Sequence, residues 1–232
     1  MKKNMVRSGK SWIDLSQPLH NNIPFSKALG SPQIEHLCFV LGKPGEETIA
    51  SVTRYCLTVH HGTHLDAPRH LIPDGKTIDE YPFTRFTGTG VILDMRKKDA
   101  VPLTINDFER AQLAIQEGDI VLLYTGWADK YLEESYHLHP YLSEEAAGWL
   151  VKRKISIVGL DVTTVDLPVP LRGESFDFPV HKILLQNDVL IIEHLGPGLK
   201  DLLNRRVTVA CFPVKILGAD GAPSPVFALI EK

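Results

Sequence analysis

Cysteine, long apolar runs and concentrated charge are all scarce in this 232-residue chain. Its three cysteines, Cys38, Cys56 and Cys211, lack the spacing of a zinc knuckle or a redox pair, so thiols buried in a reducing compartment are the simpler interpretation. The basic start, residues 1–10, is not followed by an apolar run, and the longest runs, such as 189–192, are too short to span a bilayer. We therefore expect a cytoplasmic protein without a membrane partner.

Charge is nearly balanced, with 25 Lys and Arg against 28 Asp and Glu and a net charge of −3. The basic residues are scattered, whereas a nucleic-acid surface usually carries a concentrated basic stripe, so we expect no nucleic-acid partner. The chain also lacks the Gly-x-Ser-x-Gly elbow of one class of serine hydrolases. Its length suits one sizeable core, so we expect a single domain over residues 1–232. The expected partner is a small-molecule substrate.

The pattern of apolar and turn residues predicts strands and loops first, then alternating strands and helices. The predicted strands cover 34–40, 48–60, 91–94, 119–125, 155–161, 189–193, 206–212 and 226–230. The predicted helices follow Thr104, Ser143 and Asp177, and end near 118, 154 and 187. A loose tail at 1–10 and an irregular arm at 12–32 precede them. This order indicates an α/β fold with a mixed sheet.

Histidine is concentrated in one segment, residues 60–70, which reads His-His-Gly-Thr-His-Leu-Asp-Ala-Pro-Arg-His. Four of the ten histidines fall there, where uniform scatter would place about 0.5. Imidazole and carboxylate together are the ligands that zinc, manganese or iron(II) takes in proteins. A histidine-rich surface loop is the simpler alternative to a metal site at this point.

The spacing within this segment lets three side chains converge. We expect His60 to end a strand and Gly62 to adopt a sharp turn that brings His64 back toward His60. His64 and Asp66 are two residues apart, so they point to the same side of an extended chain. Pro68 keeps the preceding residue out of the helical region. The two oxygens of Asp66 would also let it bridge a second metal.

Other polar residues near this segment have ordinary structural interpretations. His61 lies between turn residues, and we expect it to be structural or exposed. Thr63 could donate a hydrogen bond in the site, although a turn hydroxyl is the simpler role. Asp161 ends a predicted strand, and both turn capping and support of a metal ligand remain open for it.

The segment resembles, position for position, the signature His-x-Gly-Thr-His-x-Asp-x-Pro-x-His of the bacterial cyclase/arylformamidase family, which includes kynurenine formamidase and isatin hydrolase. Further matching segments are Ile-Asp-Leu-Ser-Gln-Pro-Leu at 13–19, His181 with Glu193 twelve residues later, and Gly-Ala-Asp-Gly-Ala-Pro at 218–223. The resemblance covers most of the chain. It implies a swivelling β/β/α fold, a homodimer or homotetramer, and one or two Zn²⁺ per chain, with Mn²⁺ as the alternative.

The resemblance also implies roles for individual residues. The implied metal ligands are histidines and acids from both halves of the chain: His60, His64, Asp66, His181 and Glu193. Asp66 and Glu193 would bridge two ions, and His70 would be the general acid/base. Taken alone, His181 reads as an ordinary residue of a first helical turn. Taken alone, Glu193 is most simply a solvated residue at the end of a strand. Its position weakly indicates a functional site, because sites in α/β proteins gather at strand ends.

One departure from the family concerns the substrate. In kynurenine formamidases a Trp-Pro-Gly follows the Ser-Gln-Pro-Leu arm, and its tryptophan helps to hold the aromatic substrate. Here residues 23–30 read Ile-Pro-Phe-Ser-Lys-Ala-Leu-Gly, so Phe25 is the nearest aromatic and is assigned to substrate binding. Trp12, Tyr81 and Phe83 are further pocket candidates, although core packing is the commoner role of aromatic residues.

The expected chemistry is hydrolysis of a formamide or a cyclic amide. A metal-bound hydroxide would attack the carbonyl carbon. His70, with a free imidazole pKa of about 6.5, would take the proton and return it to the leaving nitrogen. Three alternatives stay open: lactam opening of the isatin hydrolase type, a metal-dependent cyclase or dehydratase, and a metal-binding protein without turnover.

Overall fold

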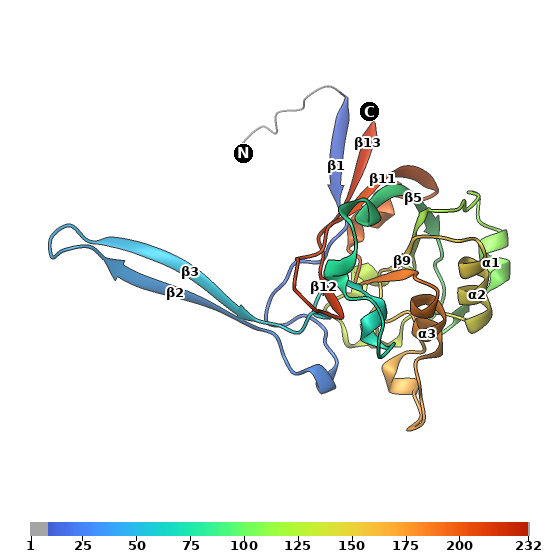
Figure 1. The fold of residues 1–232 in the computed structure, drawn as a ribbon, viewed down its shortest axis with the longest axis horizontal. Helices are drawn as coiled ribbons and strands as arrows, with labels where there is room; N and C mark the ends of the chain where they lie inside the picture. The colour runs from blue at the N-terminus through green and yellow to red at the C-terminus, as the bar shows by residue number, and fades with distance from the viewer. Residues whose placement is uncertain (1–8, 232) are drawn as a thin grey trace.

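The computed structural model describes residues 9–231, so most of the predicted tail at 1–10 lies outside the described residues. Within that range a nine-stranded sheet forms the centre of the molecule, in the order β1-β13-β11-β5-β7-β9-β10-β4-β12 (Figure 1). Its strands are β1 Lys10–Asp14, β4 His64–Asp66, β5 Thr87–Asp94, β7 Ile120–Tyr124, β9 Ile157–Leu160, β10 Leu190–Glu193, β11 Arg205–Cys211, β12 Gly221–Pro223 and β13 Val226–Glu231.

The remaining elements are short. The α-helices are α1 Ile105–Glu109, α2 Glu144–Lys152 and α3 Pro179–Gln186. Two small sheets pair β2 Gln33–Leu41 with β3 Thr48–Cys56, and β6 Pro102–Leu103 with β8 Tyr141–Leu142. Single 3-10 turns fill the connections at Lys27–Leu29, Pro68–His70, Ile78–Glu80, Phe83–Phe86, Trp127–Lys130, Glu134–Leu138, Val169–Leu171 and Pro197–Leu202.

The large sheet is mixed, which confirms the predicted α/β class. Strands β5, β7, β9 and β10 run parallel. Antiparallel strands flank them, with β11, β13 and β1 on one side and β4 and β12 on the other. Parallel strands need both faces covered, and their apolar runs here are buried throughout.

Side chains of this sheet alternate between two cores. In β5, Val91 and Leu93 belong to one cluster and Ile92 to the other, as the twofold period of a strand requires. The first cluster includes buried residues of α2 and α3, and Figure 1 shows the three helices gathered on one side of the sheet. The second cluster lies where the curled sheet and the 78–86 and 195–202 segments cover the other face.

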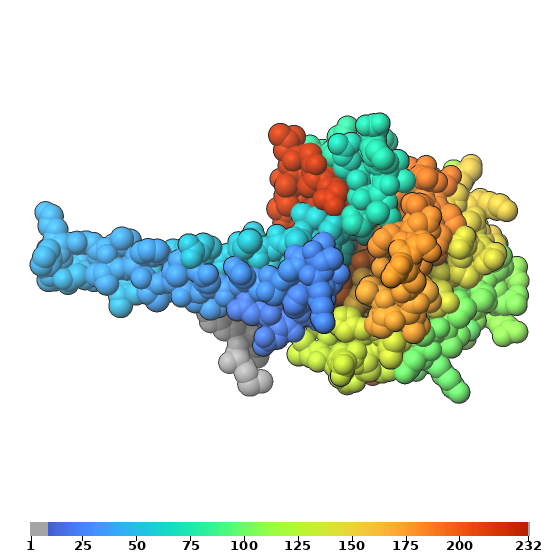
Figure 2. Space-filling view, turned by 90° about the horizontal axis from the view of Figure 1, so that it is seen from below, coloured from blue at the N-terminus to red at the C-terminus, as the bar shows by residue number. Residues whose placement is uncertain are grey.

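The hairpin of β2 and β3 projects far from the rest of the chain, here called the body (Figures 1 and 2). No side chain in either strand is buried. Apolar residues are nevertheless frequent: Val40 and Ile49, directly opposite each other, are each 70% exposed. A shallow cavity of about 630 Å³ lies at the base of this hairpin, against the 214–225 segment.

Several predicted boundaries were wrong. The predicted strand 48–60 ends at Cys56 because its partner strand begins at Gln33, directly opposite Cys56. Residues of the supposedly irregular arm, up to Asp14, form β1 by pairing with the C-terminal strand β13. The helix after Thr104 is five residues long, although its capping box with Asp107 is present.

Other predictions were confirmed. Ser143 caps α2 by accepting a hydrogen bond from the Ala146 amide. The helix predicted from Pro179 is α3, and the strands at 91–94, 119–125, 155–161, 189–193, 206–212 and 226–230 are present with small shifts of their ends. No helix in the 9–231 range has the length and apolar character needed to cross a bilayer.

Candidate metal centre

Three adjacent strands bring the predicted ligands together at one edge of the sheet. Glu193, at the end of β10, is paired with His64 at the start of β4. Asp66 ends β4 and is paired with Gly221 of β12. Between His64 and Asp66, Leu65 faces the opposite core. The predicted extended conformation of this segment is therefore confirmed, and both polar side chains point away from the core that contains Leu65.

His60 reaches the same place from a turn, so the prediction that it ends a strand was wrong. The predicted turn at Gly62 is confirmed by its φ of 68°. This positive φ favours glycine there, whereas the one close neighbour of an added Cβ atom, the end of the exposed Leu19 side chain, could move aside. The His60 Nδ1 atom lies 2.9 Å from Asp66 Oδ1, and His64 Nε2 lies 3.2 Å from the same oxygen.

The distant pair joins this cluster. His181, in the first turn of α3, places its Nε2 atom 3.2 Å from Glu193 Oε1 and 3.6 Å from Asp66 Oδ2. The other Glu193 oxygen lies 3.7 Å from His64 Nε2. All five predicted ligands thus surround one small space, with Asp66 between the two halves of the set. Ligand atoms of His60, His64 and Asp66 lie within 4.8 Å of one another.

The Nδ1 atoms of two of these histidines, which face away from the other ligands, are hydrogen-bonded to the protein. His64 Nδ1 lies 2.8 Å from the Gly62 carbonyl, and His181 Nδ1 lies 2.5 Å from Asp166 Oδ2. A ring that donates from Nδ1 keeps its Nε2 lone pair free for a metal, and such outer partners are the usual support of histidine ligands. Asp166 also accepts from the amides of Val180 and His181, so it fixes the start of α3.

Electrostatics in the cluster are dominated by its mixture of buried acids and imidazoles. Burial opposes ionisation of Asp66, but the surrounding histidines outweigh burial and hold the pKa of its carboxyl well below the ordinary range. Burial also opposes protonation of His181, yet its hydrogen bonds to carboxylates raise its pKa well above the ordinary value. For His60, hydrogen bonds to Asp220 and Asp66 overcome the same opposing burial and raise its pKa to about 10. The site is therefore built to hold positive charge.

Two ligand atoms without a hydrogen-bond partner indicate that a metal fits this cluster. His64 Nε2 and Asp66 Oδ2 are buried and have no hydrogen-bond partner, an arrangement that costs free energy and is rare in native proteins. Both atoms lie close to other predicted ligands, with His64 Nε2 3.7 Å from Glu193 Oε2 and Asp66 Oδ2 3.6 Å from His181 Nε2. A divalent cation bound there would satisfy both of them. The set of imidazole nitrogens and carboxylate oxygens suits zinc or manganese.

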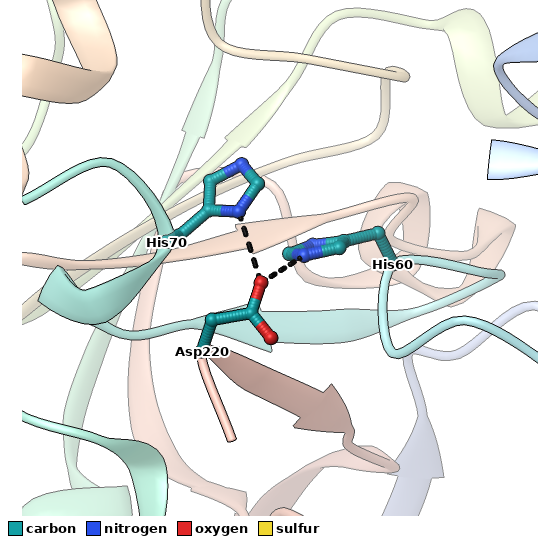
Figure 3. Close-up of side chains that lie close together, drawn as sticks. All are labelled: His60, His70 and Asp220. Carbon is teal, nitrogen blue, oxygen red and sulfur yellow. Dashed lines mark hydrogen bonds and ion pairs between the residues drawn. The ribbon is translucent and has the colours of Figure 1, made fainter. Parts of the chain in front are cut away.

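His70 lies beside this space in the Pro68–His70 turn, half-buried. Its ring centroid is 4.1 Å from that of His60 and 5.8 Å from that of His181. Its Nδ1 atom and His60 Nε2 both contact Asp220 (Figure 3). Neither Asp220 nor Asp166 was predicted as a site residue. Asp220 lies in the matched Gly-Ala-Asp-Gly-Ala-Pro segment, which was its only signal, whereas Asp166 had none.

The secondary expectations have mixed outcomes. His61 is buried and structural, with its ring bonded to the Thr58 amide and the Gly30 carbonyl. Thr63 donates to the His194 carbonyl, which confirms a structural hydroxyl. Phe25 packs edge-on against His61, at 6.1 Å between ring centroids, and its contact with a substrate stays a prediction.

Asp161 turns out to cap a turn. It accepts hydrogen bonds from the Thr125 hydroxyl and amide and from the amides of Gly126 and Ala128. Burial raises the pKa of this carboxyl despite those bonds. Of the other aromatic candidates, Phe83 is 68% exposed and packs against Phe212.

Comparisons with known proteins find relatives along most of the chain. A sequence profile of the family described as putative cyclase matches residues 13–167, more than half of the chain. Kynurenine formamidase of Bacillus cytotoxicus is 29% identical over 230 residues, covering 95% of this chain and 97% of that protein. A solved structure described as a potential metal-dependent hydrolase with cyclase activity has a TM-score of 0.75 at 27% identity, covering 96% and 99% of the two chains. Isatin hydrolase A from Labrenzia aggregata, at 23% identity, shares the fold with a TM-score of 0.82, covering 97% and 95%.

Proposed function

Because the chain belongs to the putative cyclase family, we propose that it is a metal-dependent hydrolase of a formamide or cyclic amide, similar to kynurenine formamidase. One observation carries this proposal: five histidine and carboxylate side chains converge, and two of their ligand atoms are buried without a hydrogen-bond partner. A core without a ligand would leave those atoms at a cost of about 1–3 kcal/mol each.

The residues that would hold metal form two sets sharing one carboxylate. His60, His64 and Asp66 would hold the first ion, and Asp66 and Glu193 would bridge to a second ion completed by His181. We propose Zn²⁺, one or two per chain, with Mn²⁺ as the alternative. When bound, the metal would lower the pKa of water toward neutrality and polarise a substrate carbonyl.

His70 supplies the proton transfer in this proposal. Its side chain is 25% exposed, whereas His64 and Asp66 are almost completely buried, so it is accessible to a substrate that enters from solvent. A ring nitrogen of His70 lies within 4.8 Å of ligand atoms of Asp66 and His181. It would remove a proton from the attacking water and deliver it to the leaving nitrogen. No cysteine or serine nucleophile is needed.

The substrate is proposed from the relatives. N-Formylkynurenine follows from the kynurenine formamidases, which would place the chain in tryptophan catabolism, and isatin is the alternative from the isatin hydrolases. Phe25 would contact the aromatic part of either substrate from its position beside His61. Cyclisation or dehydration with the metal as Lewis acid, and metal binding without turnover, are the other outcomes to distinguish.

The decisive experiment measures metal and activity on one sample. The protein is purified without chelator, bound metal per chain is counted by plasma mass spectrometry, and hydrolysis of N-formylkynurenine and isatin is assayed. We expect two zinc ions and formate release, with Glu193→Ala lowering the count to one. One metal with isatin opening would move the function to lactam hydrolysis, and absence of metal after reconstitution would refute the proposal.

We also propose that the chain is a cytoplasmic homodimer or homotetramer. Its three cysteines are free, which suits a reducing compartment. The expectation that all three are buried was wrong, because Cys38 and Cys56 are exposed on the hairpin and only Cys211 is buried. The hairpin exposes apolar side chains that nothing within residues 9–231 of a single chain covers, and large exposed apolar patches usually mark interaction sites. Sedimentation velocity tests this proposal, since a monomer at micromolar concentration would contradict it.

A further inference from the structure

One oxygen of Asp220 contacts two histidines of the centre at once (Figure 3). Its Oδ2 atom lies 2.8 Å from His60 Nε2 and 3.2 Å from His70 Nδ1. These two histidines have different proposed roles, since His60 would ligate metal and His70 would transfer protons. The carboxylate therefore links the metal set to the acid/base residue.

The backbone holds Asp220 firmly in this place. The Asp220 carbonyl accepts a hydrogen bond of 2.9 Å from the Ala67 amide, directly after β4. Gly221 is paired with Asp66, and a Cβ atom at Gly221 would lie 2.5 Å from the Leu65 carbonyl oxygen. Only glycine permits this close approach. The 218–221 segment is thus fixed against the strand that carries two of the ligands.

The segment is also tied to the chain that follows His70. The Gly218 amide donates to Asp79 Oδ1 at 2.9 Å, and the Ile78 amide donates to the Ala219 carbonyl at 2.9 Å. Asp220 therefore lies between β4 and the 78–79 segment, which are each hydrogen-bonded to the backbone of residues 218–220. Its contact with both imidazoles is a consequence of that placement.

Hydrogen-bond chemistry assigns the nitrogens. A carboxylate can only accept, so each ring donates its N–H to Asp220. His70 then carries its proton on Nδ1 and keeps the Nε2 lone pair. His60 Nε2 donates to Asp220 in the same way. His60 Nδ1 lies 2.9 Å from the Asp66 carboxylate and would give up its proton when a metal binds there, which would make Nδ1 the ligand atom.

We propose that Asp220 is a positioning residue that fixes the tautomer and orientation of both His60 and His70. This inference rests on the proposed metal-dependent hydrolase. In it, Asp220 directs His60 Nδ1 toward the metal and leaves His70 Nε2 as the acceptor for the proton of water. The ring of His70 does not rotate away, because its Nδ1–H stays bonded to the carboxylate.

A rival role is direct metal ligation, since His60, His70 and Asp220 also have the mutual distances of a metal site. Two observations favour positioning. The Asp220 side chain is 39% exposed, whereas Asp66 is 1% exposed. The Oδ2 atom that would ligate already accepts two N–H groups, and the orphaned atoms of the centre belong to other residues.

Calorimetric titration of chelator-treated protein with Zn²⁺ tests the metal half of the proposal. Loss of an outer partner of a histidine ligand typically weakens metal binding by about 10-fold to 100-fold, and we expect this for Asp220→Ala. Asp220→Asn keeps one acceptor oxygen and should recover part of the loss. The matched control is Asp79→Asn, which removes a charge beside the same segment but keeps an acceptor for Gly218, and should stay within about twofold of wild type.

Nitrogen chemical shifts test the tautomer half. Zinc-loaded protein labelled with ¹⁵N-histidine should show His70 as the Nδ1–H tautomer, with the signal assigned by its absence in His70→Gln. In Asp220→Ala the two His70 nitrogens should move toward the averaged shifts of a free imidazole, whereas a purely structural role would leave them unchanged. Asp79→Asn should retain the wild-type spectrum.

The outcomes separate this inference from the proposed function. Wild-type protein without zinc binding or hydrolysis would refute the proposed function itself. Wild-type protein that binds zinc, together with Asp220→Ala that keeps its affinity within twofold or its His70 shifts, would overturn the positioning role. A lower zinc count in Asp220→Asn, at unchanged affinity for the remaining ion, would also overturn it by making Asp220 a ligand.

Discussion

Asp66 and Val40 both lie in β-strands, yet their surroundings are opposite to what their chemistry prefers. The Asp66 carboxylate is completely buried, whereas Val40 on the hairpin is 70% exposed. Charged groups are almost never buried without partners, and exposed apolar patches usually mark contacts with other molecules.

The two regions differ in what the chain itself supplies. Around Asp66, the chain provides histidines, a second acid and outer hydrogen-bond partners. The hairpin is bonded to Asn21 at its base through Ile34, and beyond that point it relies on the pairing of β2 with β3. An isolated two-stranded hairpin is marginally stable in water. The comparison teaches that the two regions differ in their partners: the centre surrounds its buried charge with partners from the same chain, whereas the apolar side chains of the hairpin find no cover among residues 9–231.

Removing the central carboxylate should have the largest effect. In Asp66→Ala, three histidines lose their shared partner, and we expect zinc affinity to fall by more than about 100-fold, beyond the usual effect of an outer partner. Activity should fall at least as far. Titration calorimetry and metal counting measure the change, with Asp74→Ala, a fully exposed acid after the same segment, as control. Retention of wild-type affinity would exclude Asp66 as a ligand.

His70→Ala should separate chemistry from metal binding. General acid/base groups contribute about 10²-fold to 10⁴-fold, so turnover should fall by that factor while the metal count is retained. The control is His36→Ala, which removes an exposed histidine from the hairpin. Turnover within a few fold of wild type would show that His70 has another role.

Acid should destabilise the body through His139. Burial lowers the pKa of His139 to about 4 in the folded chain, whereas in the unfolded chain it is about 6.5. Only the unfolded chain gains this proton between those values, so stability is complete above about pH 6.5 and is lost as pH falls toward 4. The loss reaches at most about 3 kcal/mol.

Urea unfolding at about pH 7 and about pH 4.5 measures this loss. His139→Gln should reduce the difference between the two conditions, because the variant has no proton to gain. His36→Gln on the hairpin serves as the control and should unfold like wild type at both values. An equal pH dependence in wild type and His139→Gln would contradict the assignment.

The smallest effect on folding is expected on the hairpin. Val40→Lys with Ile49→Lys changes two opposed, exposed residues, and exposed substitutions usually alter stability by less than about 0.5 kcal/mol. The same double variant should shift the oligomer toward monomer in sedimentation velocity, because charge would replace the apolar contact. Thr48→Lys, at an exposed polar position of the same strand, is the matched control. An unchanged oligomer would remove this part of the hairpin from the interface.

Local sequence patterns predicted the parts of the molecule that depend on neighbours in the chain. The extended segment His64–Asp66 follows from two-residue spacing and Pro68, and the cap of α2 follows from Ser143. The short α1 could not be predicted, because Arg206 of a distant strand takes the Ala114 carbonyl and the Asp119 carboxylate and replaces the expected helix. Strand β1 was missed for the same reason, since its partner is more than 200 residues away.

The candidate site divides in the same way. His60, His64 and Asp66 were found from their own spacing, whereas His181 and Glu193 were found only through the family resemblance. Asp166 is 15 residues before the ring that it holds, and Asp220 is 150 residues after His70. Their roles depend on how β12 and α3 pack, and neither packing leaves a periodic signal in the sequence.

The pairing of β1 with β13 sets an order of events during synthesis. Residues 10–14 leave the ribosome before any other described strand, yet their partner, residues 226–231, is the last of the described strands to leave. Asp220 and β12 also follow the His60–His70 segment by about 150 residues, so the nascent chain carries that segment for a long interval without the acid that contacts it. Contacts this distant form slowly, and strand edges that wait for them are prone to aggregation. A ribosome-bound chain lacking its last few strands would therefore depend most on chaperones.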